Sequence, residues 1–397
     1  MPPPNPLSHT PGDQPSPRTQ LFRPVVLPPN LIGQPMPCDV FSARGTLMVK
    51  AGALISQRTH ETLLPQRIFC QADQAHALSG FDPVAELVRI SQSLSAISGR
   101  IALGAPVRAS ELILLARQLL EVWSLDADVC LGYARLAKFG RPSVCHSIHV
   151  ALLAAELANA QGFKIDQIEC VIGAALTMNL SKLDLHYAMF DMQRVPNAAL
   201  KQEIQSHATA SALLLQRIGG LSAEWVAAVA AHHENIDGSG YPGGLRGIEI
   251  SLPARMLRIT DTLAARLTGR KVRAPQHWNM LHARRGMQHF VAHIFGAEIR
   301  HLDSALCHKL LRALNRFPPG SLVRLSSNEL AVVTRRLPDH ALAPQSVYAV
   351  SNTQGKLLPE PSLRYLSLRR CEIRGYAHDA LPKLAHVDWP KAWGYGW

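Results

Sequence analysis

The run from His232 to Leu245, which reads HHENIDGSGYPGGL, constrains this 397-residue chain more than any other segment. Two adjacent histidines close an apolar helical stripe that contains Trp225 and Val229, and a glycine-rich loop carrying Asp237 follows at once. Imidazole nitrogens on a rigid helix, followed by backbone that can approach a ligand closely, suit a site for a metal ion and a phosphate group. The segment therefore predicts a helix that ends in a ligand-binding loop.

Helical periodicity dominates the middle of the chain and predicts an all-α domain over residues 81–316. Short β-forming runs punctuated by glycine predict two small β-rich modules, at residues 31–80 and 317–376. Residues 1–30 hold ten of the 28 prolines, which is typical of a disordered tail, and residues 377–397 form an aromatic C-terminal tail. The expected fold class is mainly α, with a helical domain flanked by small β-rich N-terminal and C-terminal modules.

Composition bounds the class of protein. Apolar residues make up 47% of the chain and charged residues 18%, which is typical of a globular protein. No apolar stretch reaches the roughly 18 residues that a membrane helix needs, and the N-terminus lacks a signal-peptide pattern. The seven cysteines are scattered and form no CxxC pair, as expected for reduced thiols. We therefore expect a cytoplasmic protein without a membrane span.

The net charge of +12 is unevenly distributed, because residues 255–336 hold fifteen Lys and Arg against four Asp and Glu, a net of +11. Such a segment is either a solvated basic face or a surface for an anionic ligand or partner. It lacks interleaved exposed aromatic residues, zinc fingers and a clear helix-turn-helix. A basic module that binds nucleic acid or another polyanion is therefore only a minor alternative, and nucleic acid is an unlikely partner.

Five polar side chains stand on helical stripes where apolar residues are expected. They are His146, His207, His232, His233 and Asp261. A single histidine in such a place is most often a hydrogen-bonded core residue. Five such groups from four predicted helices instead indicate convergence on one buried metal site.

In these motifs the chain resembles the HD-GYP family, bacterial metal-dependent phosphodiesterases that hydrolyse the second messenger cyclic di-GMP. The resemblance covers roughly residues 133–316 and implies an all-helical HD-superfamily domain. Its motifs are HSxxVA at His146–Ala151, the middle histidine at Ser206-His207, HHExxDGxGYPxGL at His232–Leu245, ARxxxxxD at Ala254–Asp261 and an RPYR-like segment at Arg270–Arg273.

The chain departs from the family at the doublet that gives the family its name. Where the family reads roughly HDIGK, this chain reads MNLSK, with Met178 and Asn179 at the doublet and only Lys182 retained. The resemblance implies that the doublet histidine and aspartate, with His146 and Asp261, would hold one ion. The aspartate would also bridge to a second ion on the other three histidines.

The substituted doublet cannot hold two ions. Met178 offers only a weak, soft thioether, and Asn179 is neutral. Two dications about 3.5–4 Å apart need a bridging anion to offset their repulsion. Three histidines still suffice for one ion with an open position. We therefore expect at most one divalent ion (Fe, Mn or Zn) and little or no turnover.

The expected function is a catalytically impaired HD-GYP-like protein of bacterial cyclic di-GMP signalling that acts as a nucleotide receptor, scaffold or partner-binding regulator. The alternative is an active phosphodiesterase whose metal site is rebuilt from the three remaining histidines, Asp261 and an unidentified carboxylate. Whether the chain is an enzyme therefore stays open at the level of sequence.

The resemblance also assigns roles to residues outside the metal site. Lys182 would be a residual catalytic residue that contacts a phosphate, unless it is an ordinary solvated lysine. Three arginines suit bidentate phosphate contacts, unless they are plain surface charge: Arg255, Arg270 and Arg273. The family's loop is implicated in contacting diguanylate cyclase (GGDEF) domains, which predicts a partner-binding loop here at Asp237, Gly238, Gly240, Tyr241 and Pro242.

Overall fold

The computed structural model divides the chain into two compact units, Met1–Asp82 and Pro83–Trp397. The residues that it describes are 22–25, 27, 31–42, 45–63, 68–71, 78, 82–182, 198–267, 294–336, 346–366, 371–377, 380–381, 384, 386–393 and 395.

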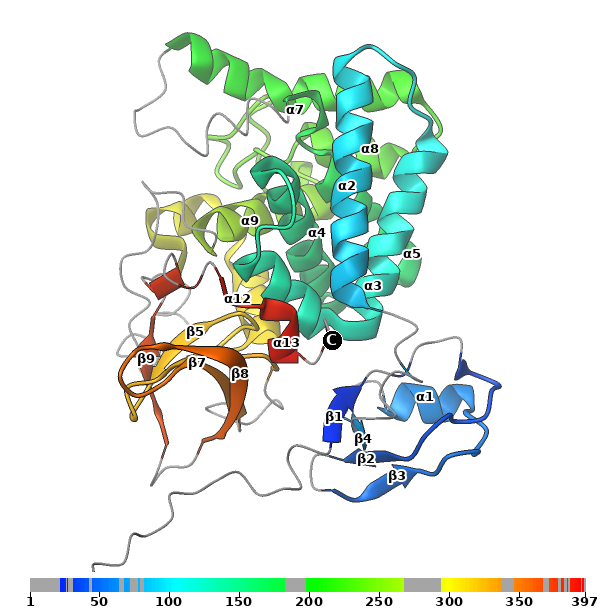
Figure 1. Ribbon diagram of the computed structural model, residues 1–397. Coiled ribbons are helices and arrows are strands. Elements are labelled where there is room, and N and C mark those ends of the chain that lie inside the picture. Colours follow the sequence, from blue (N-terminus) through cyan, green and yellow to red (C-terminus); the bar gives the residue numbers. More distant parts are fainter. Residues whose placement is uncertain are drawn as a thin grey trace, which may run out of the picture. The chain divides into compact units, whose positions relative to one another are not determined.

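The N-terminal unit is a small antiparallel sheet with one helix (Figure 1). Its strands hydrogen-bond in the order β1-β4-β2-β3. Its elements are β1 (Phe22–Val25), β2 (Val40–Ser42), β3 (Leu47–Val49), α1 (Gln57–Leu63) and β4 (Ile68–Gln71). Alternate side chains such as Val40, Ile68 and Cys70 point inward and are buried with Leu27 and Ile55, so this unit has a core of its own.

The second unit begins with the helical domain. Its elements are α2 (Pro83–Ala102), α3 (Ala109–Leu136), α4 (Pro142–Ala160), α5 (Ile165–Thr177), η4 (Leu180–Lys182), α7 (Ala198–Ile218), α8 (Ala223–Ala230), η5 (Gly247–Glu249), α9 (Leu252–Leu267), η6 (Gly296–His301) and α12 (Ser304–Leu314).

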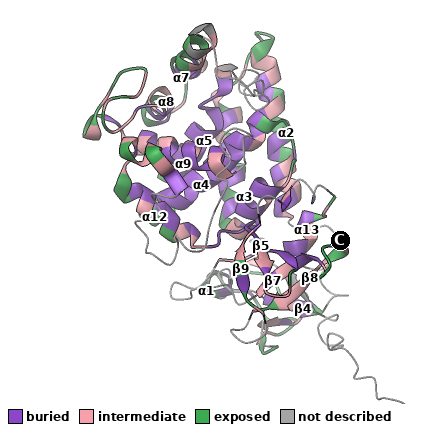
Figure 2. Ribbon diagram, turned by 90° about the vertical axis from the view of Figure 1, so that its left-hand side faces the viewer, coloured by how far each residue is buried: buried purple, intermediate pink, exposed green. Residues whose placement is uncertain are grey.

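Helix α4 lies at the centre of this domain and packs against α3, α5, α9 and α12 (Figures 1 and 2). Fifteen of its 19 residues are buried, because the sequence is apolar on nearly every side of the helix. Pro142 at the start of α4 suits the first turn, where its missing N–H has no partner to lose. His146 and His149 belong to this helix and are therefore buried in the core of the domain.

The second unit ends in an antiparallel sheet with strand order β8-β7-β6-β5-β9. Its elements are β5 (Leu322–Leu325), β6 (Leu330–Val332), β7 (Ser346–Ser351), β8 (Leu357–Tyr365), β9 (Ile373–Tyr376) and the short helix α13 (Trp389–Trp393). Leu322 of the sheet and Trp389 and Trp393 of α13 share one apolar core with Val129 of α3. Trp393 lies against Gly132, where a Cβ atom would come within 2.1 Å of the indole ring.

A network of ion pairs between partly exposed arginines and largely buried carboxylates also joins this sheet to the helices. Helix α3 is interrupted at Asp126, whose φ of −151° and ψ of 79° are not helical, and this carboxylate binds Arg335 just beyond β6. The next residue, Arg336, binds Asp128 of α3 at 2.5 Å and also Glu156 of α4. The carboxylates of Asp126 and Glu156 are each only 4% exposed, so the two arginines neutralise charges that water does not reach.

The structure confirms the predicted fold class, a helical domain with a small β-sheet on either side of it in sequence. Within the described ranges, none of the helices has both the length and the apolar character needed to cross a bilayer.

Candidate metal centre

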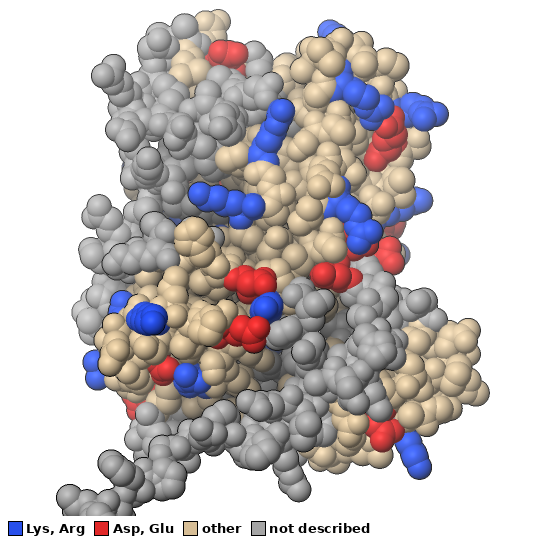
Figure 3. Space-filling view, viewed as in Figure 1, with Lys and Arg blue, Asp and Glu red and all other residues tan. Residues whose placement is uncertain are grey.

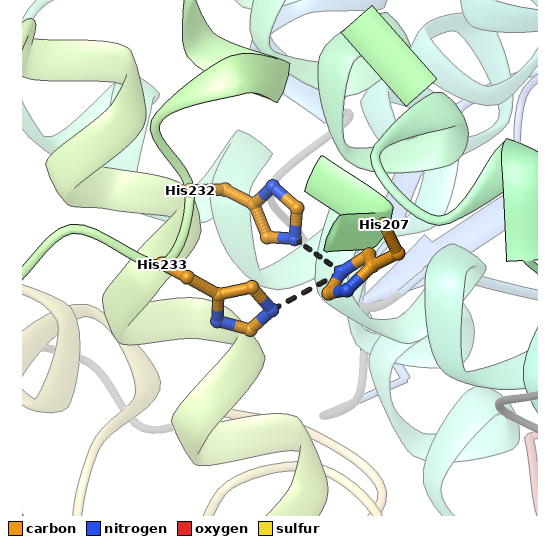
Figure 4. A group of neighbouring side chains, drawn as sticks. All are labelled: His207, His232 and His233. Carbon is orange, nitrogen blue, oxygen red and sulfur yellow. Dashed lines mark hydrogen bonds between the residues drawn. The ribbon is translucent and has the colours of Figure 1, made fainter. Parts of the chain in front are cut away.

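Three imidazoles converge where α7 meets the end of α8 (Figure 4). The Nε2 atom of His207 lies 3.1 Å from Nε2 of His232 and 3.2 Å from Nε2 of His233. His207 and His232 are 1% and 0% exposed. These three predicted residues therefore form one compact cluster of ring nitrogens.

Local packing fixes the helix that precedes two of these histidines. Ser222 caps the start of α8, because its hydroxyl accepts the backbone N–H of Trp225. The Trp225 indole donates to Thr177 of α5 at 2.9 Å and lies against Gly173, where no side chain intervenes. This contact sets the position of α8 and thus of His232 beyond its end.

Hydrogen bonds and burial fix the protonation state of the cluster. The Nδ1–H groups of His207 and His232 donate to the backbone carbonyls of Ile204 and Val229. Burial lowers the pKa of His232 to about 4, and it lowers the pKa of His207 and, more strongly, that of His233. The imidazoles are therefore neutral at pH 7, and His207 and His232 each present an Nε2 lone pair to the centre.

The Nε2 lone pairs of His207 and His232 face each other, and two lone pairs cannot hydrogen-bond, so this pair suits a Lewis acid between them. Nε2 of His233 can either donate a hydrogen bond to Nε2 of His207 or turn its own lone pair to the same centre. Nitrogen ligands about 2.0–2.1 Å from a zinc ion in a tetrahedron lie about 3.3–3.4 Å apart. The observed separations between Nε2 atoms, 3.1 and 3.2 Å, are close to this expected spacing between ligands. The donor set thus fits one divalent ion held by His207, His232 and His233, with an open fourth position.

The other two predicted ligands bind each other. Nε2 of His146 on α4 lies 2.8 Å from Oδ1 of Asp261 on α9. Burial would raise the pKa of the Asp261 carboxyl, but the hydrogen bond from His146 and the neighbouring imidazoles hold it well below its usual range. The negative charge of Asp261 offsets part of the lowering that burial imposes on the pKa of His232 and His233.

Met178 and Asn179 occupy the turn between α5 and η4 and are 0% and 1% exposed. Two residues later, the Ser181 hydroxyl donates to the backbone carbonyl of His207 at 3.1 Å. The doublet position is therefore held beside α7, and it brings a thioether and a neutral amide where the family has an imidazole and a carboxylate.

The loop after the histidines is held by a buried carboxylate. Glu234 is 2% exposed and accepts the backbone N–H groups of Gly243 and Leu245. Gly240 packs so closely on this segment that a Cβ atom would lie 2.2 Å from the backbone nitrogen of Asn235. These contacts fold the loop back onto its own start and leave Tyr241 stacked on His233, with ring centroids 4.8 Å apart.

The outer part of the loop is tied to η6. Asp237 accepts hydrogen bonds from Ser239 and lies 2.8 Å from Nδ1 of His301. The hydrogen bonds from Ser239 and the contact with His301 lower the pKa of the Asp237 carboxyl. Arg258 of α9 fixes the loop from another side, because it donates to Asn235 at 2.9 Å.

The predicted phosphate-binding residues are only partly described. Arg255 donates to Asp303 at 2.9 Å, so its guanidinium is engaged within the chain. Arg270 and Arg273 lie outside the described residues, and for Lys182 the structure describes only the backbone. On the face drawn in Figure 3, the described Lys and Arg side chains are interspersed with Asp and Glu and do not form one basic patch.

Comparison with known proteins identifies the helical domain. Residues 129–294 match the HD domain family. A 3'3'-cGAMP-specific phosphodiesterase of Vibrio cholerae is 33% identical over 136 residues, which are 34% of this chain and 31% of the relative. A cyclic di-GMP phosphodiesterase of Pseudomonas aeruginosa is 32% identical over 142 residues, 36% of this chain and 32% of the relative. With the motif at His232–Leu245, these matches show that residues 129–294 are similar to HD domains of the HD-GYP type.

The likeness covers only part of these proteins, since the chain spans about a third of the length of the curated relatives it matches. Among solved structures, an HDG"Y"P protein of Bdellovibrio bacteriovorus is similar over 73% of this chain and 98% of its own, with a TM-score of 0.44 and 10% identity.

Sequence patterns did not indicate several residues that shape this site. The role of Glu234 as the acceptor of two loop amides was missed, although its place directly after two histidines and before the glycines was a usable signal. His301 lies 64 residues from Asp237 in sequence, so no local pattern could have paired them. Nor did any pattern single out Trp225 as the contact that fixes α8.

Proposed function

We propose that this chain is an HD-GYP-type protein of cyclic dinucleotide signalling that holds one metal ion at most and hydrolyses cyclic di-GMP slowly or not at all. It acts instead as a nucleotide receptor, scaffold or partner-binding regulator. The observation that carries the proposal is Asn179, a buried neutral amide at the position where the family has its bridging aspartate.

The physical argument concerns charge. His207, His232 and His233 can hold one dication with neutral nitrogen donors. A second dication about 3.5–4 Å away would need a bridging anion, and an amide oxygen does not supply a formal charge. The Asp261 carboxylate is already bound to His146. One ion can polarise a phosphate oxygen, but it cannot stabilise both the attacking and the leaving oxygen as a two-metal site does.

The proposed ligand follows from the relatives, and the proposed partner follows from the loop. Two of them are phosphodiesterases for cyclic GMP-AMP and cyclic di-GMP, so a cyclic dinucleotide is the ligand to test first. The loop held by Glu234 keeps Asp237 and Gly240 outside the core, which supports a role for it in binding a diguanylate cyclase domain.

The deciding experiment measures metal content, nucleotide binding and hydrolysis on the purified full chain. We expect no more than one ion per chain by elemental mass spectrometry, binding of cyclic di-GMP by calorimetry, and no linearised product. His232→Ala should lose the ion, whereas the matched control His308→Ala on α12 should keep it. Two ions per chain together with hydrolysis of cyclic di-GMP would establish the active phosphodiesterase with a rebuilt site.

A second measurement separates partner binding from metal binding. A diguanylate cyclase domain should bind the variant His232→Ala about as tightly as the unsubstituted chain, because this variant keeps His233, on which Tyr241 of the loop stacks. Loss of this binding together with the metal would contradict a regulator whose loop acts independently of the ion.

A further inference from the structure

An apolar groove lies open between the end of α7 and the outer side of α8. Both helices lie at the end of the second unit that is remote from its C-terminal sheet (Figures 1 and 2). The groove has a volume of about 370 Å³, and its apolar lining includes Leu215, Leu221 and Val226. The inner side of α8 is also apolar, because Trp225 and Val229 are buried in the domain. A helix that is apolar on every side is normally covered on every side, so the groove suits an apolar side chain from a partner.

The same unit presents such a side chain on a fixed turn. Ile248 of η5 is 94% exposed, the highest value among the exposed large apolar side chains of the described residues. The backbone N–H of Arg246 donates to Glu249 at 2.8 Å, and the backbone N–H of Gly247 donates to the carbonyl of Ile236 at 3.0 Å. Because these bonds already order the turn, Ile248 can enter a groove with little further loss of backbone entropy.

The charges beside the groove and beside Ile248 are complementary. Arg246 and Glu249 flank Ile248 and are exposed. Arg217 in the last turn of α7 and Glu224 in the first turn of α8 lie on the two helices that form the groove, and they are exposed as well. Each feature therefore carries one charge of either sign, so opposite charges can meet there even though the whole chain has a net charge of +12.

We propose that Ile248 of a second copy of this chain enters the groove between α7 and α8. Two such contacts, one in each direction, join the chains as a dimer. A two-fold pair fills both grooves and covers both isoleucines, and two-fold symmetry is the most common in soluble oligomers. The dimer needs neither a metal ion nor a nucleotide, so the inference does not depend on the proposed function.

The test measures the mass of the purified full chain by analytical ultracentrifugation over a range of concentrations. The unsubstituted chain should reach twice the mass of one chain. Ile248→Asp should raise the dissociation constant of the dimer at least about ten-fold, because it brings a charge to an apolar groove. Ala227→Glu, at an exposed position in the lining, should do the same from the other side of the contact. Leu103→Asp, at an 86% exposed position after α2, is the matched control and should not change the dissociation constant.

Mixing the two weakened variants gives a second readout. Ile248→Asp keeps an open groove and Ala227→Glu keeps the isoleucine, so one of the two contacts can form between them. The mixture should therefore contain more dimer than either variant alone at the same total concentration. A mixture without this gain would refute the reciprocal contact, because grooves that pack directly against each other would not be restored by mixing.

The remaining outcomes also decide the question. A chain that stays monomeric up to the limit of its solubility would overturn the inference and leave the groove to an apolar segment of another protein. A dimer that withstands Ile248→Asp, or that Leu103→Asp weakens equally, would have its contact elsewhere and would overturn the inference too. Circular dichroism checks the fold of each variant. Should Ala227→Glu fail to fold, Gln216→Glu on the exposed side of α7 replaces it, with the same expected loss.

Discussion

Replacing Gly173 with alanine should show how α8 is positioned. A Cβ atom at this place would lie 2.0, 2.2 and 2.3 Å from three ring carbons of Trp225, far inside van der Waals contact. The ring cannot turn away without losing its hydrogen bond to Thr177. Overpacking of this kind costs about 1–3 kcal/mol. Alanine would also favour helix α5 by about 1 kcal/mol relative to glycine.

Gly99 in α2 supplies the matched control, because a Cβ atom there meets nothing within 4 Å. Both substitutions gain the same helix propensity, so the difference between them isolates the collision. In urea denaturation, Gly99→Ala should be neutral or stabilising, and Gly173→Ala should be less stable than Gly99→Ala by about 1–3 kcal/mol. Gly173→Ala should also bind metal more weakly, since α8 carries the chain to His232. Equal stability of the two variants would refute the contact.

Three further predictions concern charge. Burial lowers the pKa of His149 from 6.5 to about 3, so the unfolded state takes up a proton first as the pH falls below 6.5. Buried His149 should therefore lower the free energy of unfolding by roughly 1.4 kcal/mol between pH 7.5 and pH 5.5. Urea denaturation at these two pH values should show a smaller decrease for His149→Asn than for the unsubstituted chain. Arg336→Ala should destabilise the chain by about 1–3 kcal/mol, because the buried carboxylate of Glu156 and the partly buried one of Asp128 then lose a hydrogen-bonded counter-charge; a loss below 1 kcal/mol would contradict the network. Glu234→Gln should speed proteolysis within residues 236–245, since an amide cannot accept both backbone N–H groups as strongly as a carboxylate; an unchanged cleavage rate would contradict this role.

The main features of the fold could be predicted from periodicity. The apolar stripes of α5 and α8 indicate which side of each helix is buried, the almost wholly apolar sequence of α4 indicates a central helix, and runs punctuated by glycine indicate the strands of both sheets. Periodicity did not indicate the interruption of α3 at Asp126, where the carboxylate accepts the backbone N–H of Val129 and binds Arg335, which lies 209 residues further along the chain.

For the site, the sequence predicted which polar side chains occupy buried positions but not how they pair. Three histidines cluster, whereas His146 binds Asp261, and spacing does not distinguish a ligand of one ion from a partner of a carboxylate. The roles predicted for Arg270 and Arg273 stay predictions, since both lie outside the described residues. Arg255 illustrates a general difficulty: a guanidinium suited to phosphate is equally suited to an aspartate within the same chain.

Arg335 and Arg336, which follow β6, have a practical consequence for the design of shorter fragments of this protein. A fragment ending at residue 316 would contain Asp126, Asp128 and Glu156 but neither of the guanidinium groups that neutralise them. It would also lack the tryptophan that covers Gly132. Such a fragment would expose a surface that is acidic and partly apolar, and it would tend to aggregate or unfold. Recombinant studies and swaps between related proteins should therefore treat the helices and the C-terminal strands as one inseparable piece.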